Sequence, residues 1–284
     1  SGNNMSLDMA DFVEHCLEDE NTDVICVYLE GFKQPRKFCR VAKRALELGK
    51  PIVVLKVGRS ERAARAALAH TGSLAGSDAV IDAVFRQYGV VRVSDFEELL
   101  ETAAVLSVKK DVELPANSGI GMVGGSGGVV SLASDLAAEL NVHLPELDPD
   151  TREELIRILP PSAIVLNPVD ATAQVLNDFD MFRKTVELLS NDPNIGVILN
   201  VLPLGMPSTD LPRHQKLLEI VVGVAKTIEK PLVLCSLNSH SLDEWQKNFL
   251  KENKQFAFTQ GLRKALRAIQ LMIDYNKAYF ANKR

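Results

Sequence analysis

His70 is the residue of this sequence whose surroundings best fit a chemical role. It lies in the stretch Ala69-His70-Thr71-Gly72-Ser73-Leu74-Ala75-Gly76-Ser77-Asp78, where small residues and glycines flank a lone imidazole. A histidine that accepts a phosphoryl group and moves between partners needs backbone freedom and open space. The alternative is a neutral imidazole hydrogen-bonded in a surface loop, which is the commoner case for a random histidine. The glycines around His70 favour the interpretation of its imidazole as a nucleophile.

Glu30 is the candidate partner of that histidine. A phosphoryl-accepting imidazole needs one ring nitrogen held by an acceptor, usually a carboxylate, so that the other nitrogen is presented as the nucleophile. Glu30 ends the apolar pattern DVICVYLE and precedes Gly31, a position where α/β sheets place functional residues. Taken alone, Glu30 also fits a solvated charge at the end of a strand.

A glycine cluster, Gly124-Gly125-Ser126-Gly127-Gly128, separates a predicted strand from a predicted helix. Such a loop aims unpaired backbone N–H groups and the positive end of a helix dipole at its contents, so Gly125, Ser126, Gly127 and Gly128 are candidates for phosphate binding. The spacing is neither GxGxxG nor Walker A, since no GK[ST] follows. Tight packing of helix on strand without a ligand is the competing interpretation.

The elements around these residues alternate between helix and strand. In the first half we expect helices over 7–18, 36–48 and 78–88 and after a cap at Ser94 or Asp95. We expect a buried strand over 23–29, a second strand over 51–56 and a short strand over 90–93. In the second half we expect strands over 119–123, 195–202 and 231–236, helices over 129–140, 149–159, 179–189, 211–228, 243–251 and 261–279, and a tight turn at Asn167-Pro168-Val169-Asp170. This alternation predicts an α/β fold with parallel sheets flanked by helices.

The polar stretch 109–118, which contains Pro115, predicts a linker between domains at 1–112 and 117–284. The first half offers about three strands, fewer than the roughly five of a flavodoxin-like sheet, so a preceding part of that domain is expected to be missing.

Composition excludes several classes of protein. A net charge of -5 with 6% aromatic residues gives neither a basic field nor stacking platforms for nucleic acid. The four cysteines form no CxxC pair and the remaining histidines (His15, His143, His214 and His240) have no metal-ligand spacing, so no metal site is expected. No apolar run reaches the roughly 20 residues of a membrane span and no signal peptide is visible, which predicts a cytoplasmic protein.

Several motifs together resemble the nucleoside-diphosphate-forming acyl-CoA synthetases, relatives of succinyl-CoA synthetase. They are Tyr28-Leu29-Glu30-Gly31, Val54-Leu55-Lys56-Val57-Gly58-Arg59-Ser60, the His70 loop with Phe85-Arg86-Gln87 and Gly89-Val90 after it, the loop Gly124 to Gly128, and Asn167-Pro168-Val169-Asp170. Their order and spacing agree with the family over almost the whole chain. The resemblance implies two flavodoxin-like domains of the succinyl-CoA synthetase type.

The resemblance also implies a mechanism. An acyl-CoA such as acetyl-CoA and phosphate give an acyl phosphate, whose phosphoryl group moves to a histidine and then to ADP. The family's phosphorylated histidine falls on His70 and its orienting glutamate on Glu30. One of its two phosphate-facing helix termini falls on Gly125, Ser126, Gly127 and Gly128. CoA, ATP or ADP, phosphate and magnesium belong to the complete enzyme, and none is expected to be tightly bound to this chain.

The family's CoA-binding Rossmann domain and ATP-grasp domain do not correspond to any part of this sequence. We therefore expect the chain to depend on those domains or subunits as partners, along with a carboxylic acid, CoA and nucleotide, and to be inactive alone. An unpaired sheet edge would favour self-association into a homo-oligomer. A second hypothesis is a non-catalytic regulatory region of a protein acyltransferase, although a retained His70 counts against it. A nucleotide-binding oxidoreductase lacks its GxGxxG spacing.

Overall fold

The computed structural model describes residues 7–60, 62–63, 77–109, 111–176, 178–202 and 211–284. The chain forms two compact units. Unit 1 comprises residues 1–107 together with 274–284, and unit 2 comprises residues 108–273. The long helix α11 (Leu262–Lys283) begins in unit 2 and ends in unit 1. In sequence, unit 2 is therefore inserted between two stretches of unit 1.

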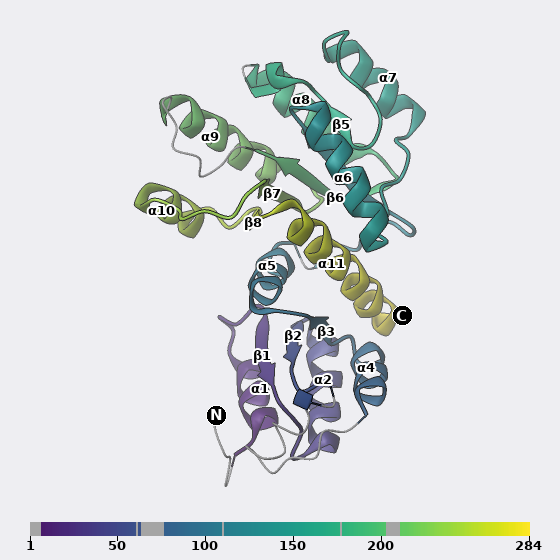
Figure 1. The fold of residues 1–284 in the computed structure, drawn as a ribbon, viewed down its shortest axis with the longest axis vertical. Helices are drawn as coiled ribbons and strands as arrows, with labels where there is room; N and C mark the ends of the chain where they lie inside the picture. Colours follow the sequence, from purple (N-terminus) through teal and green to yellow (C-terminus); the bar gives the residue numbers. More distant parts are fainter. Residues whose placement is uncertain (1–6, 61, 64–76, 110, 177, 203–210) are drawn as a thin grey trace. The chain divides into compact units, whose positions relative to one another are not determined.

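Helices and strands alternate along unit 1, as the periodicity predicts (Figure 1). The strands pair in parallel in the order β1 (Ile25–Leu29), β2 (Ile52–Lys56) and β3 (Val91–Val93). The helices are α1 (Met9–Glu18), α2 (Pro35–Leu48), α4 (Asp78–Gln87) and α5 (Phe96–Leu106). Asp8 and Asp95 cap α1 and α5, since each carboxylate accepts a hydrogen bond from a first-turn N–H.

The core of unit 1 forms where α1 and α2 pack together beside the sheet. Phe38 of α2 and Phe85 of α4 are its largest fully buried side chains. Strand β2 is buried throughout, whereas in β1 alternate residues are exposed. The buried strand predicted over 23–29 therefore forms over Ile25–Leu29 but is buried on one face only. The reason is that successive side chains of a strand point to opposite faces of the sheet: Ile25, Val27 and Leu29 join the core, whereas Cys26 and Tyr28 lie on the other face.

Unit 2 contains a larger parallel sheet with the order β5-β4-β6-β7-β8. Its strands are β4 (Gly119–Gly124), β5 (Val169–Asp170), β6 (Ile195–Val201), β7 (Leu232–Ser236) and β8 (Ala257–Gln260). Its helices, besides the first part of α11, are α6 (Gly127–Leu140), α7 (Pro149–Ile158), α8 (Phe179–Asn191), α9 (Leu211–Thr227), α10 (Glu244–Glu252) and the short 3-10 helix η1 (Ala173–Leu176). The predicted α/β class is confirmed.

One core cluster joins α7, α8 and α9 to the sheet of unit 2, with Leu155, Phe182 and Ile198 fully buried within it. Helix α6 packs on β4 and β5. The predicted apolar stripe of the last helix is confirmed, since its members are all buried: Leu262, Leu266, Ile269 and Ile273.

Two details of unit 2 differ from the sequence-based expectation. Val169 and Asp170 form a short strand that pairs with Val123 and Gly124, where a tight turn was predicted. The pairing is long-range, so local turn propensity does not reveal it. Strand β8 was not predicted at all.

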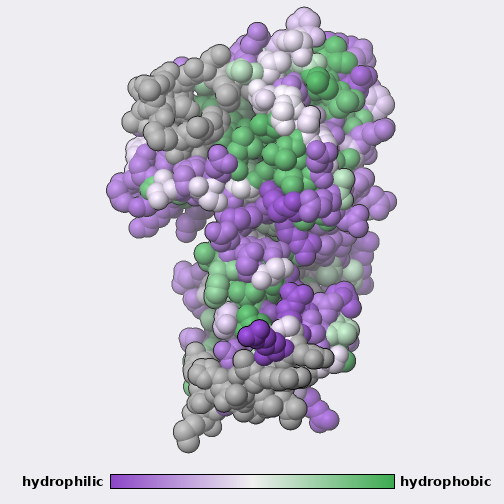
Figure 2. Space-filling model, in the orientation of Figure 1, coloured by the Kyte–Doolittle hydropathy of each residue, from purple (hydrophilic) through white to green (hydrophobic). Residues whose placement is uncertain are grey.

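Polar residues cover most of the face shown in Figure 2, interrupted by apolar patches on each unit. The exposed apolar side chains of unit 1 include Phe96 and Leu100 of α5. Among the described residues, no helix combines the length and the apolar character that crossing a membrane requires.

Candidate functional site

Glu30 follows the last residue of β1, at the carboxyl edge of the sheet of unit 1. Strand pairing places Leu29 opposite Lys56, and the N–H of Val57 donates to the carbonyl of Leu29 at 3.0 Å. Glu30 is partly buried and, within the described part of the chain, accepts no hydrogen bond on its carboxylate. Its carboxylate is thus available to a partner at the edge where parallel sheets place ligands.

A group of charged side chains lies at the same edge. Arg92 of β3 contacts Asp78 at 2.5 Å and Asp82 at 3.2 Å through its two terminal nitrogens. Arg59 lies 3.8 Å from the other oxygen of Asp78. Lys56 ends β2 and is buried, and burial lowers the pKa of its ammonium, while the nearby Asp78 carboxylate opposes that change. The sequence interpretation did not single out Lys56.

His70 lies outside the described residues, so its role and its distance from Glu30 stay predictions. Glu30 belongs to unit 1 and the glycine loop to unit 2.

The glycine loop of unit 2 connects β4 to α6, as predicted. Ser126 is the N-cap of α6 and has an extended backbone, but its side chain makes no capping hydrogen bond. The first turn of α6 carries no acidic residue. A Cβ atom at Gly125 would lie 3.5 Å from the carbonyl oxygen of Thr172, and one at Gly128 would lie 3.8 Å from Ser126 Oγ. The start of α6 can therefore present its N–H groups to an anion.

The sequence analysis named Asp170 only as part of a predicted turn and a family motif, and gave it no role at the glycine loop. This residue ends β5, is buried, and its Oδ1 accepts a hydrogen bond from the N–H of Thr172 at 3.0 Å. A Cβ atom built on Gly127 would lie 3.2 Å from its other carboxylate oxygen, so only a glycine leaves that oxygen undisturbed. The carboxylate thus lies at the electropositive start of α6. Its place at the end of the motif Asn167-Pro168-Val169-Asp170 was the available signal.

A tight turn at Asn167 is typically held by a bond from the asparagine side chain to the backbone nearby, but here the side chain reaches other parts of unit 2. Its Oδ1 accepts from the N–H of Met122 at 3.0 Å, and its Nδ2 donates to the carbonyls of Ile120 and Pro145, each at 2.8 Å. The side chain therefore anchors β4 just before the glycine loop.

No group of three or more His, Cys, Asp and Glu side chains that could hold a metal ion exists among the described residues. His15 and His143 are exposed and His240 is partly buried. Both units are parallel α/β folds with polar candidates at the carboxyl ends of their strands, the class in which ligands bind at that edge.

Two family models match the chain. Residues 1–106 match the succinyl-CoA ligase like flavodoxin domain, and residues 120–281 match the Ligase-CoA domain. The chain belongs to the succinyl-CoA ligase-like family of ADP-forming acyl-CoA ligases.

Curated relatives support this placement. The acetate–CoA ligase (ADP-forming) I of Archaeoglobus fulgidus is 35% identical over 278 residues, which are 97% of this chain and 37% of that protein. The alpha subunit of acetate–CoA ligase (ADP-forming) I of Pyrococcus furiosus is 42% identical over 174 residues, covering 60% of this chain and 36% of the subunit. The chain thus spans less than half the length of these relatives.

Solved structures show the same fold. PH0766 from Pyrococcus horikoshii OT3 matches with a TM-score of 0.73 at 26% identity, over 96% of this chain and 57% of that chain. The dinucleotide-forming acetyl-coenzyme A synthetase 1 of Ca. Korarchaeum cryptofilum, solved in complex with phosphate and ADP, matches with a TM-score of 0.77 at 24% identity. That match covers 98% of this chain and 58% of the synthetase.

Proposed function

We propose that this chain is part of an ADP-forming acid–CoA ligase and carries the phosphoryl group between its two half-reactions. The support is the match to ADP-forming relatives along nearly the whole chain, combined with Glu30 at a strand end. CoA and nucleotide sites are proposed to belong to domains or subunits beyond the matched part, so the complete reaction is proposed for the assembled enzyme. Acetate is the default acid.

In the proposed reaction, phosphate attacks the thioester carbonyl of an acyl-CoA, which releases CoA and forms an acyl phosphate. The imidazole of His70 then attacks the phosphorus, the P–O bond to the acyl group breaks, and the carboxylate leaves. Transfer of the phosphoryl group from His70 to ADP gives ATP and restores the imidazole. No redox change occurs and each step is reversible.

Glu30 acts in this proposal as a positioning residue. Its carboxylate accepts the N–H of one imidazole nitrogen, so that the other nitrogen carries the lone pair that attacks phosphorus. The observation that favours it is the absence of a hydrogen bond to this carboxylate from any described residue.

Gly125, Ser126, Gly127 and Gly128 hold phosphate at the start of α6 in this proposal. Asp170 lies beside the same helix start. The Asp170 carboxylate would repel an anion that carries no proton, whereas a protonated phosphate oxygen would donate a hydrogen bond to this carboxylate. The loop would therefore favour phosphate over sulfate, which carries no proton near neutral pH.

Phosphorylation of the full-length protein tests the proposal. Incubation with γ-labelled ATP and magnesium should give an acid-labile, base-stable label that His70→Ala abolishes. The exposed His143 supplies a matched control, because His143→Asn should keep the label. Glu30→Gln should slow labelling about ten- to hundredfold, the usual effect of losing an orienting partner, and Glu30→Asp should recover part of that rate. No label, or a label undiminished in His70→Ala, would refute the relay.

A further inference from the structure

The carboxylate of Asp170 is only half satisfied by unit 2. The residue is 8% exposed, and its Oδ1 accepts the N–H of Thr172 at 3.0 Å. No described residue donates a hydrogen bond to Oδ2, and no described cation forms an ion pair with this carboxylate. A buried carboxylate is costly unless donors or a cation satisfy it. Folding therefore leaves one oxygen for a group that the described part of the chain does not supply.

This second oxygen faces the start of α6. A Cβ atom at Gly127 would lie 3.2 Å from Oδ2, and strand pairing sets Asp170 beside Gly124, where the glycine loop begins. Thr172, which holds Oδ1, has a φ of 60°, and its carbonyl oxygen lies 3.5 Å from where a Cβ at Gly125 would stand. The carboxylate is thus fixed beside the N–H groups that the loop offers to an anion.

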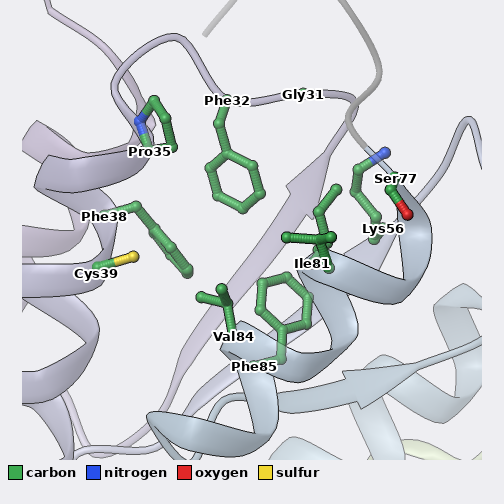
Figure 3. Close-up of a pocket in the computed structure, with 11 residues that line it drawn as sticks. Gly31, Phe32, Pro35, Phe38, Cys39, Lys56, Ser77, Ile81, Val84 and Phe85 are labelled. Carbon is green, nitrogen blue, oxygen red and sulfur yellow. The ribbon is translucent and has the colours of Figure 1, made fainter.

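The topology of unit 2 also favours a ligand at this loop. In chain order its strands are arranged 2-1-3-4-5, the flavodoxin-like order, in which ligands bind at the carboxyl ends of the first and third strands. The first strand is β4, which leads into the glycine loop. The cavity of unit 1 lined by α2 and α4 suits phosphate less well, because the rings of Phe32, Phe38 and Phe85 make its walls largely apolar (Figure 3).

A carboxylate and an anion can share one helix start when a proton lies between them. Near neutral pH inorganic phosphate carries a P–O–H group, which can donate to Oδ2 of Asp170 while other phosphate oxygens accept N–H groups of the loop. Attachment of an acyl group to phosphate makes the remaining P–O–H proton more acidic. The carboxylate is therefore placed to take up a proton that the phosphate loses as it reacts.

We propose that Asp170 is the proton acceptor for phosphate in the first half-reaction. This inference rests on the first step of the proposed function and not on His70. An unprotonated phosphate oxygen attacks the thioester carbonyl carbon, the C–S bond breaks, and sulfur leaves with the electron pair. The P–O–H proton passes to Asp170 and from there to the thiolate. The products are an acyl phosphate and the CoA thiol, and the carboxylate is restored.

Separate assays of the two half-reactions in the full-length, assembled enzyme test this role. The first assay follows CoA thiol released by phosphate in a single turnover without ADP, using the acyl-CoA that gives the wild type its fastest ATP formation. The second follows the acid-labile label from γ-labelled ATP. Asp170→Asn keeps the size of the side chain but removes the base, so it should slow CoA release about 10²–10⁴-fold. Labelling should stay nearly unchanged, because no P–O–H proton moves when ATP phosphorylates His70.

Two further variants control for a structural effect. Asp170→Glu should recover part of the rate of CoA release, because it restores a carboxylate. Asp135→Asn removes an exposed carboxylate further along α6 and should change neither half-reaction. Unchanged CoA release in Asp170→Asn, or equal losses in both half-reactions, would overturn the inference. Absence of label in the wild type would refute the relay through His70 alone, whereas absence of phosphate-dependent CoA release from every acyl-CoA would contradict both proposals.

Measurements on the wild type keep the inference testable even if Asp170→Asn does not fold. CoA release should slow in deuterated water, because a proton moves in that step, and labelling should not. In calorimetric titrations with EDTA present, phosphate should still bind, and sulfate should bind at least about tenfold more weakly because it brings no proton to Oδ2. Phosphate binding that disappears with EDTA would place a cation beside Asp170 and would overturn the proposal, as would sulfate binding as tight as that of phosphate.

Discussion

Asn167→Ala offers a direct test of how the loop of unit 2 is held. The side chain of Asn167 satisfies the N–H of Met122 and the carbonyl of Ile120, which lie on β4 before its pairing with β5 begins. It also reaches the carbonyl of Pro145. One amide group therefore replaces a missing stretch of neighbouring strand.

The magnitude follows from those three hydrogen bonds. Each contributes about 0.5–1.5 kcal/mol net, and a buried backbone group left without a partner costs about 1–3 kcal/mol. Met122 and Ile120 are fully buried, so water does not replace the lost amide there. We expect Asn167→Ala to lower the free energy of unfolding of unit 2 by about 2–4 kcal/mol.

Trp245, the single tryptophan of the chain, lies in unit 2 and makes urea unfolding of that unit observable by fluorescence. With a urea dependence of about 1–3 kcal/mol per molar, the midpoint should fall by roughly 1 M or more. Exchange of the Met122 amide hydrogen should accelerate as well. Asn194→Ala is the control, because its side chain makes one exposed hydrogen bond, to the carbonyl of Glu146. A loss below about 0.5 kcal/mol, or equal losses in both variants, would refute the reasoning.

Two further predictions concern close packing and buried charge. Gly119→Ala should destabilise unit 2 by about 1–3 kcal/mol or more, because the new Cβ would lie 2.3 Å from the backbone oxygen of His143. A Cβ at Gly223 on α9 would meet nothing within 4 Å. Gly223→Ala should therefore stabilise unit 2 by up to about 1 kcal/mol. Urea unfolding followed by Trp245 fluorescence measures both variants. Equal changes in the unfolding free energy for Gly119→Ala and Gly223→Ala would contradict the close approach of His143 to Gly119. Burial lowers the pKa of Lys56 below its ordinary 10.5, so between the two values the unfolded chain binds more protons and stability rises with pH. We expect the wild type to gain stability relative to Lys56→Met as the pH rises toward 10.5. Circular dichroism would give the unfolding free energy of both proteins at each pH. A difference between them that stays flat or falls would count against a desolvated ammonium.

The fold was largely predictable because its signals are local. Helix α2 and strand β2 begin and end within one residue of the predicted positions, since apolar periodicity, Pro35 and Gly49 all lie in the segment itself. Strand β8 escaped prediction because four residues give too short a pattern. The exposed side of β1 also escaped prediction, because it depends on which face of the sheet other parts of the chain cover.

The candidate site residues also divide into those that the local sequence predicts and those that only the fold brings into place. The positions of Glu30 at a strand end and of Gly125 at a helix start follow from the chain around them. Asp170 is 43 residues further along the chain than Gly127, and folding alone brings its carboxylate to the start of α6. Lys56 ends an ordinary apolar strand in sequence, and its burial emerges only once the fold packs other elements around the sheet.

The course of helix α11 has a consequence for synthesis of the chain. Residues 274–284 belong to unit 1 but leave the ribosome after all of unit 2. At about 5–20 residues per second, residues 108–273 delay them by roughly ten to thirty seconds. During that interval Gly49 lacks Tyr279, whose hydroxyl lies 2.7 Å from where a Cβ at Gly49 would stand. The unit that begins first therefore finishes last, and a fragment cut after residue 107 would never receive its closing helix.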